Sequence, residues 1–89
     1  MSDFDTIPVP GDRLRAGDRG HLIAIDGMTA TITSRIKLDN GEHVIRWQQI
    51  DHTDGQQPAT GIIYLPDGAT VECVRRADWL NRRDSEAAA

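Results

Sequence analysis

Two turn signals, each set within alternating apolar and polar residues, constrain this chain more than any other feature. Asn40-Gly41 interrupts the segment 29–50, and Pro66-Asp67-Gly68 interrupts the segment 61–74. Asn-Gly between alternating runs is the strongest short-range signal for a β-hairpin, and a Pro followed by a Gly suits a three-residue turn. The sequence therefore predicts two antiparallel hairpins within a small, mostly β domain.

The first hairpin is predicted with Asn40 and Gly41 as the two central residues of a type I′ turn, so that Ile36 faces Ile45. One face is apolar: Ala30, Ile32, Ser34, Ile36, Leu38, His43, Ile45 and Trp47. Its Ile36 and Ile45 are predicted to be buried. The other face is largely polar: Thr29, Thr31, Thr33, Arg35, Lys37, Val44, Arg46 and Gln48. Its Thr31, Thr33, Arg35 and Lys37 are predicted to be accessible.

The second hairpin is predicted to place Leu65 opposite Ala69 and Ile63 opposite Val71. Cys73 falls on the same apolar face, which predicts a buried thiol rather than a nucleophile. It is the single cysteine of the chain, so no intramolecular disulfide can form.

The remaining segments divide the chain into an arm, a domain and a tail. Residues 1–13 are predicted to be an extended arm, because they are polar and contain Pro8 and Pro10. Residues 14–83 are predicted to form one small β domain that ends in a helical turn, and residues 84–89 a disordered tail.

The stretch 14–23 contains Gly17-Asp18 just before an apolar strand, and a turn, a long strand and the Asn40-Gly41 hairpin follow. This arrangement resembles SH3-like small β-barrels over roughly residues 14–74. The resemblance implies an all-β fold, a five-stranded antiparallel SH3-like barrel with a short C-terminal helix. Because such barrels host unrelated functions, it carries no functional residues with it.

The composition indicates where the protein is located and what kind of genome encodes it. No apolar run is long enough to span a bilayer, so a cytoplasmic location is expected. The net charge is −4. Nine arginines against one lysine suggest a GC-rich genome, such as that of an actinobacterium or its phage. A chain of 89 residues buries only a modest core, so a homo-oligomer remains open.

Catalytic and metal-binding patterns are not apparent in the sequence. His21, His43 and His52 have no further His or Cys at ligand spacing. Six of the aspartates stand beside or near a glycine, where turn formation explains them: Asp12, Asp18, Asp26, Asp39, Asp54 and Asp67. The protein is therefore predicted not to be an enzyme and to need no metal or cofactor.

A protein-binding adaptor module is the function that the sequence favours. Ile62, Tyr64 and Val74 form a mixed apolar face with an aromatic ring, which is typical of a surface that contacts a protein partner.

A nucleic-acid-binding accessory protein is the alternative, although the net negative charge opposes it. Its phosphate contacts would come from basic residues on the first hairpin and around the C-terminal helix: Arg35, Lys37, Arg46, Arg75, Arg76, Arg82 and Arg83.

Overall fold

The computed structural model describes residues 5–17, 19–51 and 55–81 of the chain. Its strands are β1 (Thr6–Pro10), β2 (Leu22–Ile25), β3 (Met28–Lys37), β4 (His43–Gln49), β5 (Thr60–Leu65) and β6 (Thr70–Val74). A 3-10 helix, η1 (Gly11–Arg13), follows β1, and residues 76–81 are helical. The strands form one antiparallel sheet in the order β1-β6-β2-β3-β4-β5.

The prediction of an all-β fold with a short C-terminal helix is confirmed, but the sheet differs from the predicted barrel. The described residues form six strands rather than five, and the sheet is not closed, because β1 and β5 are its two edges. The additional strand β1 comes from the predicted arm. Pro8 and Pro10 lack an N–H donor, and an edge strand tolerates this because one side of it has no partner to bond.

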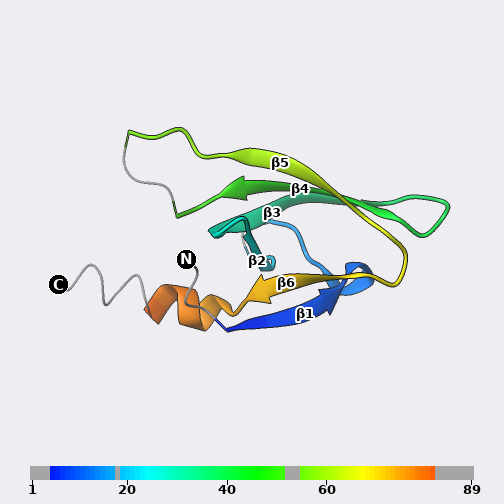
Figure 1. The fold of residues 1–89 in the computed structure, drawn as a ribbon, viewed down its shortest axis with the longest axis horizontal. Helices are drawn as coiled ribbons and strands as arrows, with labels where there is room; N and C mark the ends of the chain where they lie inside the picture. The colour runs from blue at the N-terminus through cyan, green and yellow to red at the C-terminus, as the bar shows by residue number, and fades with distance from the viewer. Residues whose placement is uncertain (1–4, 18, 52–54, 82–89) are drawn as a thin grey trace.

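The sheet bends so that its two ends face each other (Figure 1). One layer contains β3, β4 and β5, the other contains β6 and β1, and β2 lies between them. Buried side chains from both layers and from the segment after η1 form the core: Leu14, Ile23, Ala30, Ile32, Ile45, Trp47, Leu65, Val71 and Cys73.

The first turn holds three residues, 39–41, rather than two. The Leu38 N–H donates to the carbonyl oxygen of Glu42 at 2.7 Å, and the Gly41 N–H donates to the carbonyl oxygen of Leu38 at 3.0 Å. Gly41 has a φ of 89°, in the left-handed region that favours glycine. The predicted type I′ turn is therefore wrong, and the pairing of the hairpin shifts by one residue.

A β-bulge between Ile32 and Ser34 then changes which side chains of β3 face the core. Beyond it, Arg35 pairs with the buried Ile45 and lies on the inner face, whereas Ile36 is 54% exposed. The prediction of a buried Ile36 and an outward Arg35 is wrong. Because successive side chains in a strand alternate between faces, one extra residue inverts every later assignment.

For the other residues of this hairpin, some predicted faces are confirmed and others are wrong. Leu38, assigned to the apolar face, is exposed because it lies beyond the bulge, next to the turn. Thr29, assigned to the polar face, is buried, and its N–H donates to Oδ2 of Asp51 at 3.0 Å. The predicted inward side chains of β4 are all buried: His43, Ile45 and Trp47.

The second turn forms, but the strands on either side of it do not pair with each other. The Ala69 N–H donates to the carbonyl oxygen of Pro66 at 3.1 Å, and Gly68 has a φ of 80°. β5 then pairs with β4, while β6 crosses to the other layer and pairs with β1 and β2. The predicted hairpin is wrong because a turn sequence specifies a reversal of the chain and not the partner of the next strand. Cys73 is buried as predicted.

Candidate anion-binding groove

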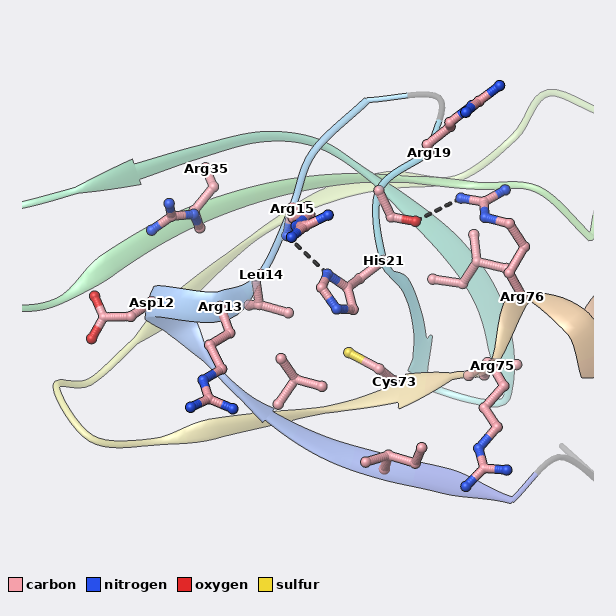
Figure 2. Close-up of a pocket in the computed structure, with 15 residues that line it drawn as sticks. Asp12, Arg13, Leu14, Arg15, Arg19, His21, Arg35, Cys73, Arg75 and Arg76 are labelled. Atoms are coloured by element: carbon pink, nitrogen blue, oxygen red, sulfur yellow. Dashed lines mark hydrogen bonds between the residues drawn. The ribbon is translucent and has the colours of Figure 1, made fainter.

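A groove of about 880 Å³ opens between the β1-β6 edge of the sheet and the segment that joins η1 to β2 (Figure 2). Six of the nine arginines of the chain line it. They come from three parts of the chain: Arg13, Arg15 and Arg19 from η1 and the segment after it, Arg35 from β3, and Arg75 and Arg76 from the residues after β6, where the C-terminal helix begins. A chain of net charge −4 thus concentrates most of its positive charge in one place.

The segment 14–21 is held in a tight loop that positions Arg15 and Arg19. The Arg15 N–H donates to Nδ1 of His21 at 2.9 Å, and the His21 N–H donates to the carbonyl oxygen of Arg15 at 3.0 Å. The guanidinium of Arg76 donates to the carbonyl oxygen of Gly20 at 2.6 Å and ties the loop to the end of β6 (Figure 2). Arg76 therefore has a structural bond within the groove.

The β-bulge in β3 brings Arg35 to the groove. Without the inversion it causes, Arg35 would lie on the outer face with Arg46, as the sequence predicted. Arg46 does lie on that outer face, exposed, and pairs across the sheet with Ile62. The bulge thus separates two arginines that were expected together.

The floor of the groove is apolar. It consists of side chains from β1, the segment after η1, and the strands β2 and β6: Ile7, Val9, Leu14, Leu22, Cys73 and Val74. In Figure 2 the labelled arginines surround Leu14, His21 and Cys73, which occupy the middle of the view. The groove therefore combines a cationic rim with an apolar base.

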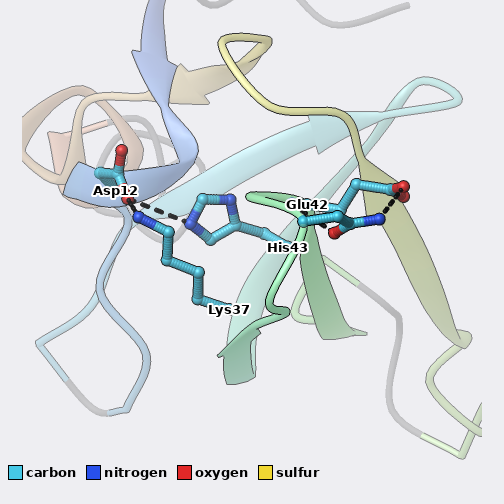
Figure 3. Close-up of polar contacts among 5 residues, drawn as sticks. Asp12, Lys37, Glu42 and His43 are labelled. Atoms are coloured by element: carbon cyan, nitrogen blue, oxygen red, sulfur yellow. Dashed lines mark hydrogen bonds and ion pairs between the residues drawn. The ribbon is translucent and has the colours of Figure 1, made fainter.

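Asp12 is the single carboxylate among the described residues that line the groove, and it is already engaged (Figure 3). The Lys37 ammonium donates to its Oδ1 at 3.1 Å, and Nε2 of His43 lies 3.3 Å from the same oxygen. The hydrogen bond and the charge of Lys37, with a smaller effect of His43, lower the pKa of the Asp12 carboxyl. Among the described residues, no carboxylate forms an ion pair with a groove arginine.

Two other titratable groups face the groove. Partial burial, with the charge of Arg15 as a second cause, lowers the pKa of His21. A neutral His21 can accept the Arg15 N–H at Nδ1. Burial, assisted by the charge of Glu72, raises the pKa of the Cys73 thiol to about 11. At neutral pH the thiol is protonated, which makes it a poor nucleophile.

The structure brings together some of the predicted nucleic-acid-binding residues and separates others. Arg35, Arg75 and Arg76 line the groove. Lys37 instead pairs with Asp12, and Arg46 lies on the outer face. Arg82 and Arg83 lie outside the described residues.

Sequence reasoning missed Arg13, Arg15 and Arg19. A signal for two of them was present, because Gly-Asp-Arg occurs at 11–13 and again at 17–19. These short repeats place Arg13 and Arg19 at either end of the segment that borders the groove.

The predicted protein-binding residues do not share one surface. Ile62 and Tyr64 project from the outer face of β5 and are 47% and 67% exposed. Val74 lies on β6, between β1 and β2, and is 3% exposed.

The described residues contain no group of three or more His, Cys, Asp or Glu side chains that could hold a metal ion. Within the same residues, no helix has the length and apolar character needed to cross a membrane. Comparison with protein-family models, curated proteins and solved structures finds no match to this chain.

Proposed function

We propose that this protein is a non-enzymatic binding module that holds an acidic segment of a protein partner in the arginine groove. The observation that carries the proposal is that six arginines line one groove, in which Lys37 engages the single carboxylate of the described lining residues. Like charges that share a groove repel one another, and an anionic ligand would relieve that repulsion.

The chemistry of the rim favours carboxylates. A guanidinium offers a planar fork of donors that binds a carboxylate through two parallel hydrogen bonds. Arg13, Arg15, Arg19 and Arg75 are exposed and can reach a ligand, whereas Arg76 is held by Gly20. A local positive field of this kind attracts acidic partners even though the whole chain is negative.

The floor of the groove favours a peptide over a nucleic acid. Its aliphatic side chains, such as Ile7 and Val9, suit an apolar residue within an acidic segment. Single-stranded nucleic acids are usually held by aromatic rings on which bases stack. Among the described residues that line the groove there is no Phe, Tyr or Trp.

We propose that β2 to β6 correspond to an SH3-like barrel, with β1 added at one edge. The support is the return of the chain to its starting strand: β6 pairs with β2, through Leu22 with Val74 and Ile23 with Cys73. The bulge between Ile32 and Ser34 supplies a strong bend in the long hairpin, as such small barrels need.

Fluorescence anisotropy tests the proposed function directly. The probe is a short labelled peptide of glutamates around a central leucine, compared with a labelled single-stranded oligonucleotide and a labelled duplex. Arg75→Gln is expected to weaken peptide binding roughly two- to tenfold, since it removes one exposed charge pair. Arg46→Gln is the matched control, because it makes the same change in charge at an exposed arginine outside the groove.

The outcomes separate the two classes of partner. Salt-sensitive binding of the peptide that weakens with Arg75→Gln and not with Arg46→Gln supports the proposal. Tighter binding of either nucleic acid than of the peptide, with the same dependence on Arg75, would promote the nucleic-acid alternative. Equal effects of the two substitutions would show that the groove is not the site.

A further inference from the structure

The outer face of the β3-β4-β5 layer carries a strip of exposed apolar side chains. Ile36, Val44 and Tyr64 lie in one row, because Val44 pairs with Ile36 on one side and with Tyr64 on the other. Ile62 occupies the next outward position on β5, opposite Arg46. Tyr64 is 67% exposed and Ile36 is 54% exposed, so the strip continues to the edge of the sheet without cover from the described residues.

The backbone of β5 has a free side. The Gln49 N–H donates to the carbonyl oxygen of Ala59 at 2.8 Å, so Ala59 faces β4. In an antiparallel ladder, alternate residues bond to the same neighbour, which leaves residues 61, 63 and 65 facing β4. The backbone groups of Thr60, Ile62 and Tyr64 therefore point away from the sheet, where none of the described strands pairs with them.

The two edges of the sheet differ in how they are protected. β1 contains Pro8 and Pro10, and proline is one of the common devices that prevent an edge strand from pairing with another chain. The sequence of β5, Thr-Gly-Ile-Ile-Tyr-Leu, contains neither proline nor a charged residue. An unprotected, apolar edge strand is a template for a further strand.

We infer that β5 pairs with β5 of a second copy of this chain, antiparallel and about a two-fold axis at Ile63. In this register Ile62 lies opposite Tyr64 of the second copy, and both have outward backbone groups free to bond. An antiparallel strand pair with two-fold symmetry presents the same surface from each copy.

The residues of β5 favour pairing of this strand with β5 of a second copy. β5 has no charged residue, so the axis brings no like charges together. Each Tyr64 ring packs beside an Ile62 of the other copy, an aromatic–β-branched pair of the kind that stabilises neighbouring strands. The apolar strips of the two copies then meet at these Ile62–Tyr64 pairs. The inference is independent of the arginine groove, which lies at the opposite, β1 edge of the sheet.

Sedimentation velocity over a range of protein concentrations tests the interface. The wild-type chain is expected to sediment as a dimer at high concentration. Ile62→Glu is expected to weaken dimerisation roughly tenfold or more, because it buries a carboxylate beside Tyr64 of the second copy. Within one copy the new carboxylate faces Arg46, so the fold is preserved. Leu80→Glu, at a residue of similar exposure on the helix, is the matched control and should remain dimeric.

Disulfide formation between two single variants tests the register. Ile62→Cys and Tyr64→Cys chains should cross-link when mixed and oxidised, because these positions lie opposite each other. Neither variant should cross-link when it is oxidised alone. Its two cysteines, one in each copy, then lie two residues apart along the paired strands, which is beyond the reach of a disulfide bond. A wild-type chain that stays monomeric at high concentration, an Ile62→Glu chain that dimerises normally, or equal cross-linking within each variant alone would overturn the inference.

Discussion

The imidazole of His43 packs directly against the backbone of Gly11, where η1 begins. A Cβ placed on Gly11 would lie 2.5 Å from Nδ1 of His43. His43 is itself buried on β4, and its Nε2 approaches the Asp12 carboxylate. This contact therefore ties the first hairpin to η1 and fixes the start of the segment that carries the groove arginines.

Gly11→Ala is expected to lower the free energy of unfolding by about 1–3 kcal/mol, because the added methyl group must displace a buried ring. Urea unfolding followed by circular dichroism measures the change. The same substitution in a His43→Ala background should cost much less, since the ring is then absent. An equal cost in both backgrounds would show that the His43 contact is not the cause.

Ile45 on β4 and Ile36 on β3 can be compared to test the change of faces that the bulge causes in β3. Ile45 is fully buried on β4, whereas Ile36 is 54% exposed on the outer face. Ile45→Ala is expected to lower the free energy of unfolding by about 2–5 kcal/mol, and Ile36→Ala by no more than about 0.5 kcal/mol.

Urea unfolding of the two variants, with Ile45→Val as a milder substitute if Ile45→Ala does not fold, checks this prediction. The sequence alone predicts equal costs, because it places both residues in the core. Equal measured costs would thus contradict the position of the bulge between Ile32 and Ser34.

The elements of the first hairpin were predictable, because alternation and the Asn40-Gly41 turn are local properties of the sequence. The bulge was not, since Thr33 and Ser34 have no feature that marks an extra residue in a strand. One unrecognised residue was enough to place Arg35, which lines the groove, on the wrong face.

The strands with which β6 pairs also could not be predicted from the local sequence. Pro66-Asp67-Gly68 forms the predicted turn, yet β6 is placed by its pairing with β1 and β2. That pairing depends on contacts between residues far apart in the chain, such as Ile7 with Cys73. The groove between these strands could not be predicted without it, although the arginines that line it are visible in the sequence.

Cys73 should be unreactive in the folded protein. Burial and the nearby Glu72 raise the pKa of its thiol from 9.0 to about 11, which reduces the thiolate at a given pH roughly hundredfold. Labelling with a thiol-specific disulfide reagent at pH 8 should therefore be slow in buffer and rapid in strong urea. Rapid labelling in buffer, at a rate close to that of the unfolded chain, would contradict the buried position of Cys73.

The free energy of unfolding should fall in mild acid, because His21 holds the loop that carries Arg15 and Arg19. Burial and the charge of Arg15 lower the pKa of His21 below its ordinary value of 6.5. Between the two pKa values the unfolded chain binds more protons than the folded chain, so the free energy of unfolding falls as the pH decreases from about 6.5 toward the lowered value. Above about pH 6.5, the contribution of neutral His21 to the free energy of unfolding is fully present. Protonation of Nδ1 also removes the acceptor of the Arg15 N–H.

Nuclear magnetic resonance titration of the imidazole protons gives the pKa of His21 directly, and urea unfolding at several pH values gives the change in stability. In the His21→Asn variant, the side-chain oxygen can still accept the Arg15 N–H but does not titrate in this range. The decline in stability attributable to His21 should therefore disappear in this variant, while the stability at neutral pH is largely retained. A His21 that titrates at or above 6.5 in the folded protein, or an unchanged pH dependence in His21→Asn, would show that the loop bond is not linked to protonation.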